Sequence, residues 1–332
     1  MNAPLRVGVI GRGAWGSRII ATLLTKTRHC EHAWDCDSKV KLEEILGPKF
    51  TTPSTVDFVI IATPYHTHAK LMEQCFDRAI PFIVEKPAAN VFELQKLSVK
   101  YATSVVGRVS TTPFLVNHTF LFNPAIEAMV NFAHRFESRG TPIELRGEHG
   151  GMGPIRDDCN ALLDYGSHGI ALALWLSKAE KVHAIRLYCG TKAVLKGTQV
   201  PDLHGPQNFT LEAHFEHLKF HLRTGNAYPK KRLLYTTVYD IGQGDPMTHR
   251  MREFPERELL SYLGSDLLEM PFATDIDPLT NALDTFARVM KGELPTDERF
   301  GWDLPLRTMQ VLETCDELLR EADREDEEGS LN

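Results

Sequence analysis

The feature that most constrains this chain is a glycine-rich turn between a short strand and a helix. Leu5–Ile10 is a β-branched run, and residues 17–24 carry apolar side chains at helical spacing. Between them lies Gly11-Arg12-Gly13-Ala14-Trp15-Gly16. In such a turn the first glycine permits a tight bend, the second lets the backbone approach a pyrophosphate, and the third lets helix and strand pack closely. This context predicts dinucleotide binding, with the phosphates at the helix N-terminus.

The next hundred residues continue as alternating strands and helices. Nearly continuous apolar runs, typical of strands buried on both faces of a parallel sheet, lie at 56–62, 81–84 and 114–118. Helical patterns lie at 69–78 and 91–103. We therefore expect an α/β fold that begins with a Rossmann domain, a doubly wound parallel sheet, over residues 1–122.

The pattern changes after residue 122. Helices are expected at 125–135, 158–176, 278–290 and 305–320, and strands at 182–188, 208–215, 218–223 and 232–239. Strands without intervening helices favour a large, mostly antiparallel sheet with helices to one side. We expect an α+β substrate and oligomerisation domain over 123–320 and an acidic tail over 321–332. One face of a single-layer sheet, left uncovered by helices, would be apolar and best buried against another subunit, so we expect a homodimer or homotetramer.

Charge and composition exclude several classes of protein. The formal net charge is −7, and the chain has no lysine- or arginine-rich stripe interleaved with aromatic residues, so nucleic acid is not an expected partner. The N-terminus leads directly into a strand, and no apolar stretch is long enough to span a membrane, so neither export nor membrane insertion is expected. The six cysteines are scattered, which argues against a disulfide framework and fits a cytoplasmic location.

A carboxylate that binds the adenosine ribose is expected at the end of a second strand, 31–36. Asp35 and Asp37 both lie there, and either would favour NAD over NADP. Asp37, just after the strand, is slightly preferred, while one of the two could merely cap a loop. Lys39 and Lys41 keep NADP open.

Three further motifs follow the glycine turn. They are Ala62-Thr63-Pro64-Tyr65-His66-Thr67-His68, Val84-Glu85-Lys86-Pro87 and Leu163-Asp164-Tyr165-Gly166-Ser167-His168-Gly169. Together they resemble the Gfo/Idh/MocA oxidoreductases over nearly the whole chain. The resemblance implies that Ala62, Thr63, Pro64, His66, His68, Glu85 and Lys86 contact the cofactor, and that the third motif is an active-site helix.

Other motifs resemble the members of this family that act on nucleotide-linked or N-acetylated sugars. These are Val116-Asn117-His118-Thr119-Phe120 with Phe122-Asn123-Pro124, Gly153-Pro154-Ile155-Arg156, and the Trp15-Gly16 pair. We therefore expect a sugar or sugar nucleotide as substrate, with His118, Arg156 and Asn160 among the residues that bind it. Arg156 could equally be a solvated residue at a helix start.

Oxidation of a secondary alcohol needs a base for the hydroxyl proton and a positive group near the developing alkoxide. Lys86 ends a strand at the edge where α/β sheets bind ligands. Asp164 and His168 stand four apart and share a helix face. By resemblance, His168 is the base and Asp164 its orienting or substrate-binding partner. The competing interpretations are a solvated lysine, a locally paired aspartate and a hydrogen-bonded core histidine.

Two other readings of the chain compete with an NAD(P)-dependent dehydrogenase or reductase. The segment from Asp37 to Val56, interrupted by Pro48 and Pro53, has room for at most a short helix, which motivates an inactive dinucleotide-binding sensor or scaffold. A glycine turn alone also occurs in methyltransferases. A metal site is not expected, because strand alternation places only His217 and His221 on one face, apart from His214, with no carboxylate or cysteine at helpful spacing.

Overall fold

The computed structural model describes two compact units. The described residues are 3–36, 56–102, 112–137, 143–150, 160–178, 181–189, 192–193, 208–216, 218–225, 232–239, 247–252 and 277–329. The first unit comprises residues 1–123 with 276–306, and the second 124–275 with 307–332. The boundary between residues 123 and 124 lies next to the one predicted at residue 122, but residues 276–306 belong to the first unit as well.

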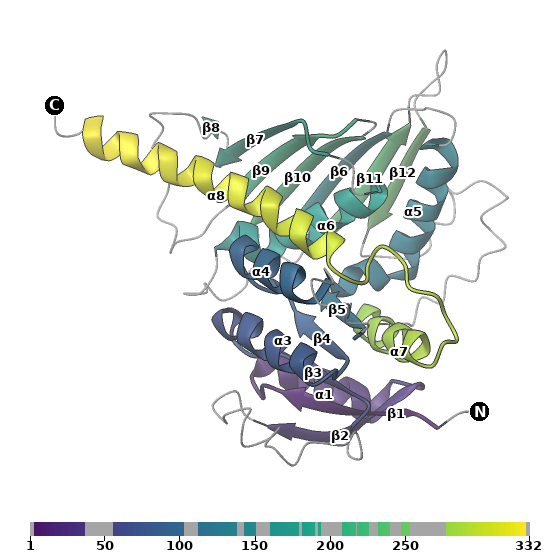
Figure 1. The fold of residues 1–332 in the computed structure, drawn as a ribbon. Helices are drawn as coiled ribbons and strands as arrows, with labels where there is room; N and C mark the ends of the chain where they lie inside the picture. Colours follow the sequence, from purple (N-terminus) through teal and green to yellow (C-terminus); the bar gives the residue numbers. More distant parts are fainter. Residues whose placement is uncertain are drawn as a thin grey trace. The chain divides into compact units, whose positions relative to one another are not determined.

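The first unit contains the predicted parallel sheet (Figure 1). Its described strands are β1 (Leu5–Ile10), β2 (Cys30–Cys36), β3 (Phe58–Ile61), β4 (Phe82–Glu85) and β5 (Phe114–Asn117). They lie in the order β2-β1-β3-β4-β5, and every neighbouring pair is parallel. All residues of β3, β4 and β5 are buried, as expected of strands covered on both faces. The order reverses beside β1, which is where such sheets bind ligands.

Helices cover both faces of this sheet. Those of the first unit are α1 (Ala14–Thr25), α3 (His68–Asp77), α4 (Val91–Ala102) and α7 (Pro278–Met290), with short 3₁₀ turns at Tyr65–Thr67 and Thr119–Phe122. Phe58 of β3 packs against Phe286 of α7, with ring centroids 5.0 Å apart. Phe82 of β4, which points to the other face, packs at 5.0 Å against Phe76 of α3. The sheet is therefore doubly wound, as predicted.

Residues 276–306 belong to the first unit, where hydrogen bonds and ring contacts hold them. The Asp284 carboxylate on α7 accepts hydrogen bonds from the backbone N–H groups of Arg28 and His29, just before β2, at 3.0 and 2.9 Å. Arg299 is 8% exposed, donates to the Leu121 carbonyl oxygen at 3.1 Å and stacks over the Phe122 ring. The predicted second domain therefore lacks α7.

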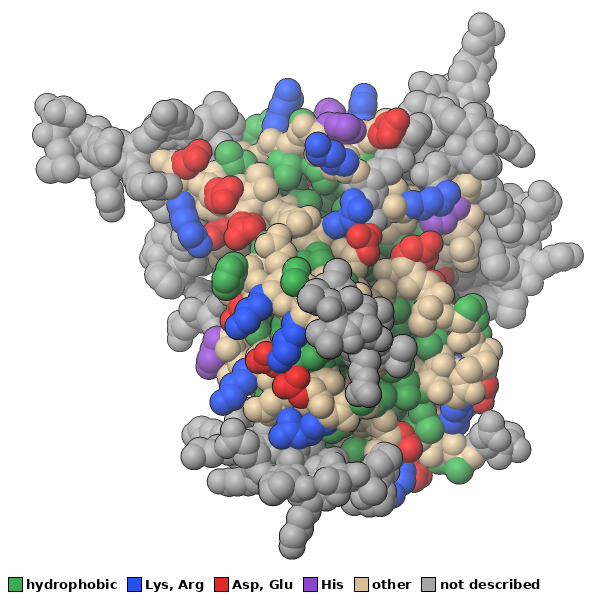
Figure 2. All heavy atoms as spheres, viewed as in Figure 1, with side chains coloured by type: hydrophobic (Ala, Val, Ile, Leu, Met, Phe, Trp, Pro, Cys, Tyr) green, Lys and Arg blue, Asp and Glu red, His purple; other side chains and the backbone are tan. Residues whose placement is uncertain are grey.

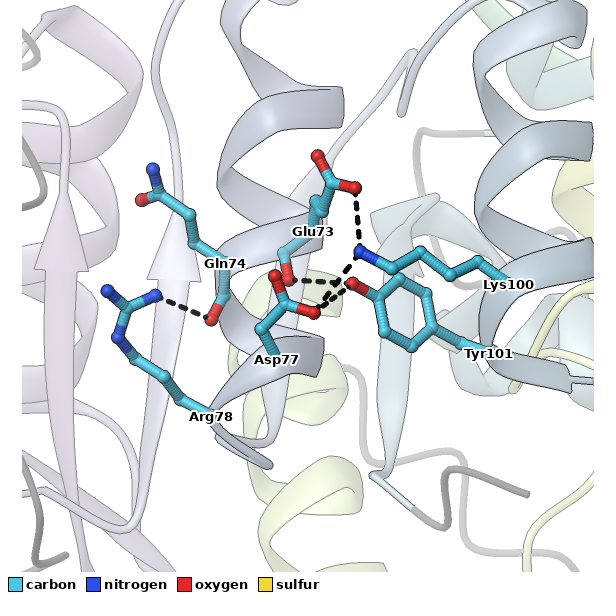
Figure 3. Close-up of polar contacts among 6 residues, drawn as sticks. All are labelled: Glu73, Gln74, Asp77, Arg78, Lys100 and Tyr101. Atoms are coloured by element: carbon cyan, nitrogen blue, oxygen red, sulfur yellow. Dashed lines mark hydrogen bonds and ion pairs between the residues drawn. The ribbon is translucent and has the colours of Figure 1, made fainter. Parts of the chain in front are cut away.

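Helices α3 and α4 are joined at their surface by a polar cluster (Figure 3). The Lys100 ammonium donates to Glu73 at 2.9 Å and to Asp77 at 3.3 Å, and the Tyr101 hydroxyl donates to Asp77 at 2.5 Å. Burial of the Tyr101 phenol, then its bond to Asp77, raises its pKa to about 12. This cluster lies on the helices and contains none of the predicted site residues.

The second unit is built on a larger sheet with helices packed against it (Figure 1). Its strands are β6 (Ile143–Gly150), β7 (Ala184–Cys189), β8 (Lys192–Ala193), β9 (Asn208–His214), β10 (Leu218–Gly225), β11 (Arg232–Tyr239) and β12 (Met247–Arg252). Their order is β12-β11-β6-β10-β9-β7-β8, and only β6 and β10 pair in parallel among these described strands. Helices α5 (Pro124–Glu137) and α6 (Ser167–Leu176) pack on it. The mostly antiparallel α+β prediction is confirmed.

The two faces of this sheet differ in chemistry. Leu145, Phe220 and Leu222 are buried on the face that α6 contacts. The opposite face carries charged side chains in ion pairs, including Arg146 with Glu144, Arg223 with Glu148, and His221 between Glu144 and Glu212. The assumption of an uncovered apolar face is therefore wrong for these strands, and a homo-oligomer stays a prediction without that support. His217, one of the three histidines considered as metal ligands, lies outside the described residues.

Several elements differ from the predicted pattern. Strands β6 and β12 were not predicted, because their runs mix charged residues and glycine or methionine rather than alternating cleanly. The helix expected over 158–176 contains a π-helical turn, Leu162–Gly166, before α6. The last helix, α8, runs over Asp303–Gly329, so its backbone continues through most of the predicted acidic tail.

The described surface mixes charges of both signs. On the face drawn in Figure 2, acidic and basic side chains lie interspersed rather than in separate patches. Within the described ranges, no helix combines the length and apolar character needed to cross a membrane. The same part of the chain holds no cluster of three His, Cys, Asp or Glu side chains arranged to bind a metal ion.

Candidate functional site

The glycine turn follows β1 directly and leads into α1. Gly11 has φ +107°, a conformation that side-chain-bearing residues rarely adopt, and its N–H donates to the Cys36 carbonyl oxygen at 2.9 Å. A Cβ at Gly11 would overlap the backbone of Ala62, the residue that follows β3. The first glycine therefore lets the turn pass between the ends of β2 and β3.

The other two glycines of the turn have different surroundings. A Cβ at Gly16 would overlap the Gly11 carbonyl oxygen, so α1 packs against the turn only because Gly16 has no side chain. A Cβ at Gly13 would meet nothing within 4 Å. Gly13 is the N-cap of α1, whose first N–H groups are thus left beside open space. This cradle has the form and polarity that suit a pyrophosphate.

One of the two candidate ribose-binding carboxylates is described. Asp35 lies near the end of β2 and is 19% exposed, with Arg12 Nε 2.7 Å from its Oδ1 and His32 Nε2 3.0 Å from its Oδ2. Asp37, the preferred candidate, lies outside the described residues. The described chain therefore offers Asp35 for a ribose, already paired with a cation from the glycine turn.

The loop after β3 is ordered by its own side chains. Thr63 and Thr67 share a hydrogen bond of 2.6 Å between their hydroxyl oxygens, and the Thr67 hydroxyl also lies 2.7 Å from the Pro64 carbonyl oxygen. Pro64 and His66 are exposed. His68 is only 1% exposed, with Nε2 2.8 Å from the Thr63 carbonyl oxygen and Nδ1 2.9 Å from that of Pro87. His68 thus holds the loop from within, whereas His66 faces solvent.

Strand β4 ends in Glu85, followed by Lys86. Glu85 is 8% exposed and accepts a hydrogen bond of 2.6 Å from Asn117 Nδ2, its register partner on β5. Burial raises the pKa of Glu85, and the Trp15 indole, the Asn117 amide and the Lys86 charge oppose the shift. Lys86 is half-buried, and its peptide bond to Pro87 is cis. Asn117 belongs to the motif at residues 116–120 but was not predicted as a site residue.

His118 follows β5 and is 3% exposed. Burial, reinforced by the positive charge of Lys86, lowers the pKa of His118 from 6.5 to about 3. The imidazole is therefore neutral at physiological pH, and can both donate and accept a hydrogen bond. The structure thus brings Lys86 and His118 within electrostatic reach at the carboxyl edge of the sheet.

The second unit contains the remaining described candidates. The Asn160 side-chain oxygen accepts from the Leu163 N–H at 2.8 Å, which is a helix cap. Asp164 lies inside the π-helical turn and is half-buried, whereas His168, in the first turn of α6, is 9% exposed. π-Helical turns occur often at functional sites. Arg156, the other predicted substrate residue, lies outside the described residues.

Three residues of the second unit join this group although they were not predicted. The ring of His149, near the end of β6, stacks on that of His168 with centroids 5.2 Å apart, and meets Tyr165 edge-on at 5.8 Å. Thr224 of β10 pairs with His149 in the register and is fully buried. Burial and the nearby Asp164 charge raise the pKa of Tyr165. Leu145, Gly147 and His149 alternate along β6 and share its inward face, and this pattern could have placed His149 near the site.

Comparisons with known proteins agree with this geometry. Residues 5–106 match the family model GFO_IDH_MocA, described as "Oxidoreductase family, NAD-binding Rossmann fold". Inositol 2-dehydrogenase 2 of Paenarthrobacter aurescens (strain TC1) is 26% identical over 186 residues, 52% of this chain and 55% of that protein. The match thus spans about half the length of either protein.

Solved structures extend the likeness to the whole fold. The scyllo-inositol dehydrogenase of Lactobacillus casei with bound NAD(H) and scyllo-inositol has 14% identity and a TM-score of 0.68, covering 98% of both chains. UDP-N-acetylglucosamine 3-dehydrogenase GnnA of Acidithiobacillus ferrooxidans has 16% identity and a TM-score of 0.63, covering 98% of this chain and 99% of that one. At these identities the likeness concerns the fold alone. Residues 5–106 of this chain are thus similar to the NAD-binding Rossmann fold of the Gfo/Idh/MocA oxidoreductases.

Proposed function

We propose that this chain is an NAD(P)-dependent oxidoreductase acting on a secondary hydroxyl or keto carbon of a sugar or sugar nucleotide. The observation that carries the proposal is that Lys86 and neutral His118 follow adjacent strands, at the same edge of the sheet as the glycine cradle. The residues present fit a dinucleotide: Gly11–Gly16 for the pyrophosphate, Asp35 for the ribose, and the Thr63 and Glu85 loops beyond. When bound, the nicotinamide supplies or accepts the hydride.

The protein side of the reaction is assigned to three residues. Lys86 places a positive charge near the substrate oxygen, where it stabilises a developing alkoxide. His168 takes or returns the hydroxyl proton, and Asp164 orients the substrate or the imidazole. Their motifs resemble the family's catalytic ones, and two of the three proteins named above are inositol dehydrogenases by name.

A turnover screen with matched binding measurements tests this function. The purified chain is incubated with NAD or NADP and a panel of sugar nucleotides, free sugars and inositols, and reduced nicotinamide is followed by absorbance. In parallel, quenching of tryptophan fluorescence measures cofactor binding without substrate. Turnover with one member of the panel supports the proposal. Cofactor binding with no turnover on any member would favour the sensor alternative, and no binding at all would exclude both.

A further inference from the structure

The glycine turn and the end of β2 are joined by a small charged cluster. Arg12 Nε lies 2.7 Å from Asp35 Oδ1, and His32 Nε2 lies 3.0 Å from Asp35 Oδ2. The register of β2 against β1 shifts by one residue at this point, with Val7 opposite His32 but Gly8 opposite Trp34. This irregularity accompanies the contact between two side chains three residues apart, which a regular strand would turn to opposite faces.

This cluster lies where dinucleotide folds choose between NAD and NADP. In such folds a carboxylate at the end of the second strand accepts hydrogen bonds from the adenosine ribose, whereas an arginine nearby accommodates the 2′-phosphate of NADP. This chain has both groups, and they are paired with each other. Arg12 is 62% exposed and Asp35 19% exposed, so the pair is open to solvent on the arginine side. An ion pair this exposed is weak and exchanges readily for another partner.

We propose that Arg12 determines cofactor choice by allowing NADP to bind beside Asp35. When NADP binds, the guanidinium of Arg12 stays close enough to Asp35 to offset the carboxylate's negative charge. It also donates hydrogen bonds to the 2′-phosphate, for which a planar cation is well suited. With NAD, Arg12 stays on Asp35 and the remaining carboxylate acceptor positions serve the ribose hydroxyls. The chain therefore accepts both cofactors, and loss of Arg12 removes NADP selectively. This inference rests on the proposed function, since it assumes dinucleotide binding.

The test compares the dissociation constants of NAD and NADP, measured by isothermal calorimetry at fixed ionic strength. For Arg12→Ala we expect NADP binding to weaken about tenfold or more, the loss of a charge-assisted contact, with NAD binding little changed. Arg12→Lys should retain part of the NADP affinity. Asp35→Asn should tighten NADP binding, because the carboxylate no longer repels the phosphate. Arg78→Ala is the matched control, because Arg78 caps the far end of α3 through the Gln74 carbonyl.

Other results would overturn the inference. If Arg12→Ala weakens the binding of both cofactors equally, or of neither, Arg12 only holds the glycine turn against β2, and another residue determines cofactor specificity. Circular dichroism of each variant shows whether a loss of cofactor binding reflects unfolding. If Arg12→Ala is unfolded, the ratio of the NAD and NADP dissociation constants in Arg12→Lys and Asp35→Asn tests the inference instead. If the wild-type chain binds NAD but not NADP, dual acceptance is wrong while the proposed function stands. If it binds neither, the proposed function itself fails.

Discussion

The imidazole of His68 joins two loops of the Rossmann domain: its Nδ1 lies 2.9 Å from the carbonyl oxygen of Pro87, while Nε2 faces that of Thr63 at 2.8 Å. Pro87 directly follows Lys86, so one buried ring links the loop after β3 to the proposed catalytic lysine. A neutral imidazole donates to one of these two carbonyl oxygens, and a residue without a ring leaves that carbonyl without its donor.

His68→Ala should therefore destabilise the protein and loosen cofactor binding together. We expect a loss of about 2–4 kcal/mol in the free energy of unfolding, from the cavity and the carbonyl that loses its donor. Urea unfolding and NAD titration measure the two effects. His66→Ala, an exposed neighbour in the same loop, is the control for stability and should change it little. Equal stability losses in the two variants would contradict the linking role of His68.

Gly13 and Gly16 offer a paired test of the cradle. In Gly16→Ala the new methyl overlaps the Gly11 carbonyl oxygen, and overpacking of this kind costs about 1–3 kcal/mol or more. In Gly13→Ala the methyl points into open space, so stability should fall by no more than about 1 kcal/mol through a poorer N-cap. The same methyl stands where the pyrophosphate is expected, so NAD affinity should drop. A stable Gly13→Ala chain with unchanged NAD affinity would place the phosphates elsewhere.

His118 should make the protein less stable in mild acid. Its pKa is about 3 when folded against 6.5 for the ordinary side chain, so between these values the unfolded chain binds more protons than the folded one. This contribution to stability is complete above the unfolded pKa and shrinks as the pH falls toward 3. From pH 7.5 to 5.0 the loss is about 2 kcal/mol. In His118→Gln that part of the pH dependence should vanish in urea unfolding, whereas parallel curves for both proteins would contradict a buried neutral imidazole.

Asp284 should be worth more to stability than a neighbouring aspartate in surface ion pairs. Asp284→Ala removes a carboxylate that accepts from two backbone N–H groups ahead of β2, and should cost about 2–3 kcal/mol. Asp277→Ala breaks the pairs with Arg18 and Lys26, both more than half exposed, and should cost about 1 kcal/mol or less. Thermal unfolding of the two variants gives the comparison. Similar shifts in both would mean that α7 is not anchored through Asp284.

Much of the first unit could be predicted from local pattern. The roles of Gly11, Gly13 and Gly16 depend on local backbone geometry that the motif itself encodes. Strands β3 to β5 are short apolar runs, which are typical of strands buried in a parallel sheet. The return of residues 276–306 could not be predicted, because it depends on contacts such as Asp284 with Arg28, far apart in the chain. The role of His68 in joining two loops could not be predicted either, because it depends on contacts with the carbonyl oxygens of Thr63 and Pro87. Its contact with a cofactor stays a prediction.

The second unit was harder because its signals are weaker. Strand β6 was missed since glycines and charges interrupt its apolar residues, and with it His149, which stacks on His168. Gly166 ends the π-helical turn at a crowded position, where a Cβ would overlap Leu162 and touch Thr224 of β10, a contact distant in the sequence. The alternation of Lys219, His221 and Arg223 already indicated that the sheet face opposite α6 is charged, contrary to the apolar face that we expected. Asp37 and Arg156 lie outside the described residues and stay predictions.

Substitution of Lys86 separates cofactor binding from turnover. Lys86→Met keeps the length of the side chain but removes its charge, and Lys96→Met, at an exposed position on α4, is the matched control. With a substrate found in the turnover screen, we expect Lys86→Met to lower kcat at least about a hundredfold while NAD still binds, the usual effect of losing a group that stabilises the transition state. Turnover in Lys86→Met equal to that of Lys96→Met would rule out a catalytic role for Lys86.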